Sequence, residues 1–263
     1  MMHDYFLICY PTCGTHGGGH SMNGFTSTPV EGCQIWVPDP DQSTAHALLL
    51  TTLATTVGGN FLSPDSTLNQ PQFGNLGEFL TLYVGDSCAG LPSTYRCHPV
   101  NGREPLKRVS DSGVDLLWFH FDADPQDDLI VLQEVKSTRQ ADLRHADGLI
   151  DDYQKLFSTD PAVILSSRIG SLKLLLRVTL RKPELVARCD RFVGTEPTEC
   201  RDLRLMPTLV FDTSVAMHGA AARKLSIVRT TICGDGWLDT QVQPWGICLD
   251  ELEAEFEALA KGS

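Results

Sequence analysis

Three ionisable side chains interrupt two apolar runs in the stretch GVDLLWFHFDADPQDDLIVLQEVKS, residues 113–137. Asp115 lies in the first run, and Glu134 and Lys136 lie in the second. Carboxylate and carbonyl oxygens are the ligands of Mg²⁺, which keeps several of its waters. A lysine beside such a cation can position a water or stabilise developing negative charge. These residue types therefore suit metal-assisted hydrolysis of a phosphodiester.

A β-hairpin would bring the three side chains together. If its loop is centred after residue 124, paired residue numbers sum to 249 and Asp115 faces Glu134. Directly opposed residues have Cβ atoms about 4.5–5.5 Å apart, and Lys136, two residues after Glu134, shares its face. We therefore predict a site for Mg²⁺ (or Mn²⁺) whose protein ligands are Asp115, Glu134 and the carbonyl of Val135.

Two carboxylates so close in apolar surroundings cannot both ionise cheaply, and they need a shared proton, the lysine or a metal. Both faces of the two runs are apolar, which is typical of strands buried between helices. The alternative to a metal site is a buried ion pair between Glu134 and Lys136. For the acids of the intervening loop, residues 122–128, the sequence favours a solvated hairpin tip over a calcium site, because it lacks the EF-hand glycine and terminal Glu.

Further elements must support this hairpin. We predict helices at residues 44–57, 75–85, 141–157 and 249–261. The runs at 162–166, 172–180 and 205–211 fit either strands or short buried helices, which periodicity cannot separate. One α/β domain is the simplest account, with residues 1–60 as an N-terminal elaboration and residues 61–263 as the main domain.

The order of these motifs resembles the PD-(D/E)xK nuclease superfamily over about residues 74–157. The matching positions are Glu78 in GEFL, Asp115 in GVD, Glu134 and Lys136 in QEVKS, and the helix 141–157. The resemblance implies a restriction-endonuclease-like core, in which helices flank a mixed central sheet. It also implies a Mg²⁺-dependent endodeoxyribonuclease whose catalytic residues are these three acids and the lysine.

Glu78 departs from the rest of this pattern. The apolar stripe of its helix comprises Leu76, Phe79, Leu80 and Tyr83, and a helical wheel places Glu78 opposite that stripe. In the superfamily the corresponding acid helps the metal site. A solvated side chain is the alternative for Glu78.

Within the superfamily, the GEFL helix, the GVD strand and the ExKS strand resemble the nuclease subunit of Hachiman-type antiphage systems. That resemblance implies a role in bacterial antiviral defence, DNA as substrate, and a helicase or ATPase partner protein. The alternative function is a catalytically inactive nuclease-fold module that binds DNA or a partner. A purely structural adaptor with a buried ion pair is the third possibility.

The net negative charge of the chain is consistent with a partner protein that binds most of the DNA. The 263 residues carry 33 acids against 21 lysines and arginines, a net charge of −12. A protein that grips nucleic acid unaided usually shows a basic footprint. Here only local basic patches occur, at residues 103–108 and 177–182.

Several features favour the cytoplasm. No run reaches the roughly 20 apolar residues of a membrane span, and the N-terminus lacks the basic region of a secretory signal. Nine cysteines without a repeating framework indicate free thiols in a reducing compartment. Cys9, Cys13, His16 and His20 are zinc-competent, but their C-x3-C-x2-H-x3-H spacing is compressed relative to usual zinc sites.

Overall fold

The computed structural model describes residues 24–42, 62–85, 95–96, 115–156, 161–194, 197–200, 202–214 and 216–262. Among these residues, seven strands form one sheet in the order β1-β2-β7-β6-β5-β4-β3. Their bounds are β1 Phe25–Val30, β2 Cys33–Pro38, β3 Tyr95–Arg96, β4 Leu116–His120, β5 Leu129–Thr138, β6 Leu203–Asp212 and β7 Trp245–Leu249. Strands β2, β7, β6 and β5 run parallel, whereas β1, β4 and β3 pair with their neighbours in antiparallel fashion. The prediction of an α/β fold with a mixed sheet is confirmed.

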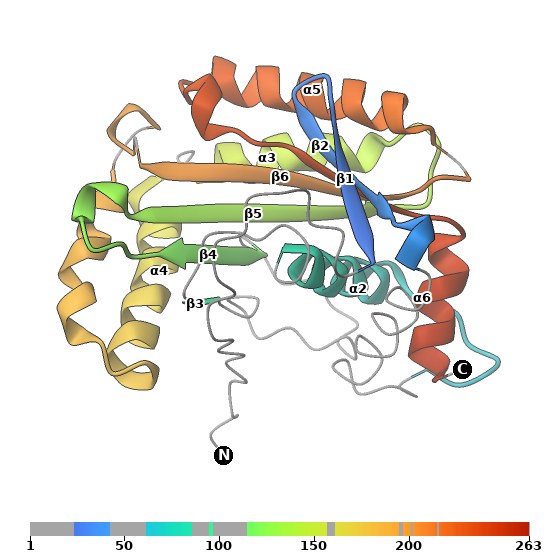
Figure 1. The fold of residues 1–263 in the computed structure, drawn as a ribbon, viewed down its shortest axis with the longest axis horizontal. Coiled ribbons are helices and arrows are strands. Elements are labelled where there is room, and N and C mark those ends of the chain that lie inside the picture. Colours follow the sequence, from blue (N-terminus) through green and yellow to red (C-terminus); the bar gives the residue numbers. More distant parts are fainter. Residues whose placement is uncertain are drawn as a thin grey trace.

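Helices cover both faces of the sheet (Figure 1). Helices α2 (Gln70–Tyr83) and α6 (Leu252–Lys261) bury one face, and α3 (Asp147–Lys155), α4 (Pro161–Leu174) and α5 (His218–Gly234) bury the other. Shorter turns join them: the 3-10 helices Pro40–Gln42, η3 Pro125–Asp127, η4 Arg144–Ala146, Pro183–Leu185, η7 Ala187–Phe192, Pro197–Glu199 and Asp239–Gln241, and the π-helix Leu175–Thr179. The central strands are therefore buried on both sides, as their apolar sequence predicts.

The predicted hairpin register is confirmed. Leu116 of β4 pairs with Gln133 of β5, and His120 pairs with Leu129, so every pair sums to 249. The run at 205–211 is a strand, within β6. The runs at 162–166 and 172–180 are helical, because Leu165, Ile169, Leu172 and Leu176 recur at helical spacing and are buried as one stripe. The helix predicted at 44–57 lies outside the described residues.

The first two strands extend the sheet at one edge. They lie in the range 1–60, and β2 pairs in parallel with β7. The turn between β1 and β2 has both Glu31 and Gly32 at positive φ, the backbone conformation that a tight two-residue hairpin turn requires. The part of this range that the structure describes is thus built into the same sheet as the predicted site.

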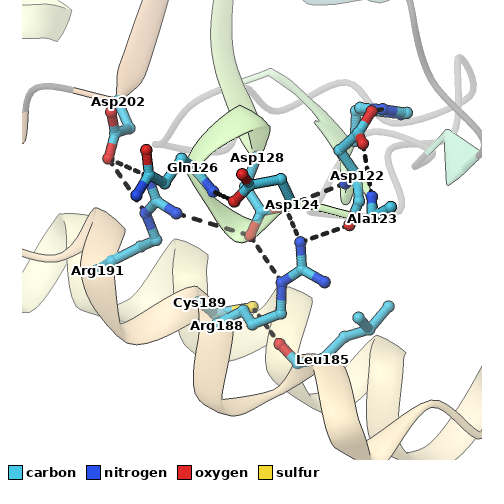
Figure 2. Close-up of polar contacts among 11 residues, drawn as sticks. Asp122, Ala123, Asp124, Gln126, Asp128, Leu185, Arg188, Cys189, Arg191 and Asp202 are labelled. Carbon is cyan, nitrogen blue, oxygen red and sulfur yellow. Dashed lines mark hydrogen bonds and ion pairs between the residues drawn. The ribbon is translucent and has the colours of Figure 1, made fainter.

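The tip of the β4–β5 hairpin is exposed at residues 123–127, as predicted, but the prediction of a solvated side chain is wrong for Asp128, which arginines hold. The side chain of Asp128 is fully buried, and Arg188 Nε donates to its Oδ2 at 2.8 Å. Arg188 also donates to the carbonyl of Asp122 at 2.7 Å. Figure 2 shows Arg188 and Arg191 reaching from η7 toward the tip, where Arg191 also pairs with Asp202. The tertiary fold brings η7 under the hairpin, which the loop sequence does not reveal.

Helix α2 begins at Gln70 through a capping box, in which Asn69 Oδ1 accepts from Gln72 N at 2.9 Å and Gln72 Oε1 accepts from Asn69 N at 3.1 Å. Gly77 lets the helix lie close to β5. A Cβ built on Gly77 would stand 1.9 Å from Ser137 Oγ. Because Ser137 is buried, this collision cannot be relieved by a turn of the side chain into solvent.

Gly77→Ala is expected to lower the free energy of unfolding by about 1–3 kcal/mol, the usual cost of overpacking a core. Gly74, one turn earlier on α2, is the matched control, since a Cβ there meets nothing within 4 Å. Gly74→Ala should raise stability by about 0.5–1 kcal/mol through helix propensity. Urea unfolding followed by circular dichroism measures both. Equal effects of the two substitutions would contradict the close packing of α2 on β5.

Among the described residues, none of the helices combines the length and the apolar character that a bilayer crossing requires.

Candidate functional site

The site lies where β4 stops pairing with β5. Asp115 directly precedes β4, and its Oδ2 accepts a hydrogen bond from Val135 N at 2.7 Å. The register places Asp115 opposite Glu134, one step beyond the last pair of the ladder. Both acids are buried, with 3% of each residue exposed. The structure therefore places Asp115, directly before β4, opposite Glu134 of β5, as the sequence predicts.

Lys136 lies between two acids. Its Nζ is 2.9 Å from Glu134 Oε1, and it also forms an ion pair with Asp152 of α3. The second oxygen of Asp152 pairs with Lys155 at 2.8 Å. The buried ion pair between Glu134 and Lys136 is thus present. Asp152 was not a predicted site residue, and its place on the helix 141–157 was the signal that could have found it.

Negative charge exceeds positive charge around Lys136. Burial, followed by the neighbouring Asp115, raises the pKa of Glu134 well above its usual range, although Lys136 acts in the opposite direction. Burial by itself would lower the pKa of Lys136, but Glu134, Asp115 and Asp152 together raise it. Among the described residues, the buried Oε2 of Glu134 has no hydrogen-bond partner. A proton on Glu134 or a second cation would balance this excess of acids.

Tyr153 of α3 fixes the backbone at Glu134. Glu134 lies opposite Pro207 of β6 in the parallel register. The Tyr153 hydroxyl donates to Leu132 O at 3.0 Å and accepts from Glu134 N at 3.1 Å. Burial and the nearby Glu134 raise the pKa of Tyr153, so its hydroxyl keeps its proton. A side chain from α3 thus bonds the backbone of β5 beside the site.

Tyr153→Phe is expected to lower the free energy of unfolding by about 1–3 kcal/mol, because it leaves a buried carbonyl and a buried N–H without this partner. Slow amide hydrogen exchange at Glu134 should be lost at the same time. Exchange measured by NMR or mass spectrometry checks both effects. Unchanged protection at Glu134 would mean that the tyrosine does not hold this strand.

Glu78 is buried, with 4% exposed, so the alternative of a solvated side chain is wrong. It belongs to α2, which covers the face of the sheet opposite α3. Glu134 and Lys136 lie on the α3 face. Asp115, Glu134 and Lys136 are therefore brought together, whereas participation of Glu78 in a metal site stays a prediction.

Within the part of the chain that the structure describes, no three His, Cys, Asp or Glu side chains form a group that could hold a metal. The predicted ligands are two carboxylates and a carbonyl, which is a sufficient set for Mg²⁺ when waters and a phosphate complete it. The zinc-competent Cys9, Cys13, His16 and His20 and the basic patch at 103–108 lie outside the described residues.

No family model matches the chain, and no curated protein matches its sequence.

Proposed function

We propose that this protein is a Mg²⁺-dependent endodeoxyribonuclease with a restriction-endonuclease-like core. The observation that carries the proposal is the cluster of the buried Asp115 and Glu134 with the half-buried Lys136, at the end of a hairpin in the predicted register. The order of α2, β4, β5 and α3 along the chain supports it, because this is the order that the PD-(D/E)xK resemblance implies.

The residues present fit a magnesium ion. Glu134 Oε2 is buried without a hydrogen-bond partner among the described residues, and Asp115 lies beside it. The N–H and C=O of one strand residue point to the same side, so the Val135 carbonyl shares the side of its N–H, which faces Asp115. Asp115, Glu134 and Val135 would hold the ion, which supplies charge to a phosphate oxygen and lowers the pKa of a bound water.

The chain supplies the remaining chemistry through Lys136. Its side chain is 27% exposed, whereas that of Glu134 is only 4% exposed. The ammonium therefore lies at the rim of the buried acids, where a phosphate can approach. It can stabilise negative charge that develops on the phosphate or position the attacking water.

A larger assembly is part of this proposal. The net charge of −12 repels a polyanion at long range, so the chain needs another source of DNA affinity. A helicase or ATPase partner would supply it, as the resemblance to the nuclease subunit of Hachiman-type antiphage systems implies. We place this assembly in bacterial antiviral defence in the cytoplasm.

Metal binding tests the site independently of the DNA substrate. Titration with Mn²⁺ or Mg²⁺ should raise the melting temperature of the wild-type protein, because a ligand that binds the native state stabilises it. Asp115→Asn should abolish this rise. Asp250→Asn, a change at an exposed turn residue, should keep it. A wild-type protein that neither responds to the metals nor cuts DNA in their presence would refute the proposed nuclease.

The ion pairs of Lys136 with Glu134 and Asp152 favour a second candidate, an inactive nuclease-fold module that binds DNA or a partner. In that case the lysine merely neutralises the acids. Replacing the pair by Glu134→Leu with Lys136→Met should then leave DNA or partner binding unchanged, because apolar residues often replace a buried pair at no cost. Loss of metal binding in the double variant, with the fold intact, would favour the nuclease.

A further inference from the structure

Helix α3 lies against the outer half of the Lys136 side chain, from Cδ to the ammonium. Gly148 and Asp152 lie four residues apart, so they occupy the same face of the helix, one turn apart. A Cβ built on Gly148 would stand 3.2 Å from Lys136 Cε and 3.8 Å from Cδ. One turn later, the carboxylate of Asp152 meets the ammonium. The lysine stem therefore crosses the helix where a glycine leaves room for it, and its end reaches an acid.

We infer that Gly148 and Asp152 form a slot for Lys136, and that Asp152 is the positioning residue of this lysine in the proposed nuclease reaction. This inference deepens the proposed function and depends on it for its catalytic meaning. Lys136 itself touches the phosphate or the water, whereas Asp152 acts through Lys136.

Lys136 needs a second acidic partner because Glu134 has two roles in the proposed site. Its Oε1 pairs with Lys136, and the same carboxylate is a proposed metal ligand. Once Glu134 turns to a cation, the lysine loses much of its attraction to that acid. A free lysine side chain has about 2 kcal/mol of rotamer entropy, and it would spread over many conformations. Asp152 belongs to another element and keeps the ammonium beside the site.

Each carboxylate oxygen of Asp152 pairs with a different lysine. Oδ2 pairs with Lys136, and Oδ1 pairs with Lys155 at 2.8 Å. Lys155 is 61% exposed, while Asp152 is only 25% exposed. The outer lysine thereby orients the carboxylate from the solvent side, and the inner oxygen is directed to Lys136. Asp151, the preceding residue on α3, is exposed and provides a matched control.

The slot can be measured without any nuclease assay. An ammonium held in an ion pair exchanges its protons slowly with water and gives a resolved ¹⁵N NMR signal, which Lys136→Met assigns. We expect this signal in the wild-type protein and in Asp151→Asn. Asp152→Asn should broaden it beyond detection, and Gly148→Ala should shift it because the added methyl displaces Lys136 Cε. A signal unchanged by both Asp152→Asn and Gly148→Ala would overturn the slot.

Kinetics then tests the positioning role. Single-turnover cleavage of DNA by Asp152→Asn should slow by about 10- to 100-fold, the scale of a misplaced catalytic group. The KM for DNA and the affinity for Mn²⁺ should stay at wild-type values, and Asp152→Glu should recover part of the rate. Cleavage by Asp152→Asn at the wild-type rate would overturn the positioning role while leaving the nuclease intact. If even the wild-type protein with its partner fails to cut, the proposed function falls, and the NMR result alone decides the slot.

Discussion

Glu134→Gln is expected to reduce metal-dependent DNA cleavage by about 100- to 1,000-fold, the usual effect of removing one electrostatic contributor to a transition state. The amide keeps the size of the side chain and an oxygen that can accept from Lys136, but it lacks the charge that would hold the metal. Single-turnover cleavage of a labelled duplex measures the loss. Glu184→Gln, at an exposed position, is the control and should cut at the wild-type rate.

The same substitution is expected to stabilise the protein at neutral pH. Burial and Asp115 raise the pKa of Glu134 in the folded protein above its value of about 4.3 in the unfolded chain. The stability that Glu134 contributes is therefore fully present below the unfolded pKa and is lost as the pH rises through the folded pKa. A neutral glutamine does not undergo this loss. The difference in melting temperature between the variant and the wild type should therefore grow as the pH rises.

Lys136→Met should reduce cleavage by a similar factor of about 100 to 1,000, but with the opposite effect on stability. It removes the cation that lies between Glu134 and Asp152, so the remaining acids are left without their main partner. A lower melting temperature than that of the wild type is expected at neutral pH. If Glu134→Gln raises the melting temperature, Lys136→Met lowers it, and both lose cleavage, the two residues form a reaction site. In a purely structural ion pair, neither substitution would affect cleavage. Wild-type cleavage by both variants would place the catalytic site elsewhere.

The second large effect concerns the partner. The purified chain is expected to degrade little or no DNA at physiological salt, and a co-encoded helicase is expected to bind it and switch cutting on. With 33 acids against 21 basic residues, the chain repels DNA at long range, and salt weakens what local basic patches attract. A nuclease that receives DNA from an ATP-driven partner needs little DNA affinity of its own.

Recovery of partners from cells, followed by cleavage assays over a range of salt concentrations, measures this dependence. The complex that contains Glu134→Gln is the control, because it keeps the helicase and should lose the cutting. Robust, salt-tolerant degradation by the isolated chain, with no stable partner recovered, would contradict the assembly but not the catalytic residues. Cutting by the Glu134→Gln complex would assign the nuclease to the partner.

The residue pattern of 113–137 was sufficient to predict the hairpin and the pairing of its acids. Side chains alternate between faces with a period of two, and a loop centred after residue 124 gives the register in which paired numbers sum to 249. The approach of Asp115 to Glu134 follows directly from that register. Lys136 follows from the same period, because it is two residues further along β5. Local rules were enough for these three residues, since all three belong to one hairpin.

The surroundings of these three residues depend on how distant elements pack, which the sequence pattern does not reveal. Asp152 reaches Lys136, and the Tyr153 hydroxyl bonds the backbone of Leu132 and Glu134, because α3 packs on that face of the sheet at a particular height and rotation. The same holds for the hairpin tip, where Arg188 buries Asp128 from a distant turn. Helix packing depends on the shapes of both surfaces, and no short-range period in the sequence encodes that fit.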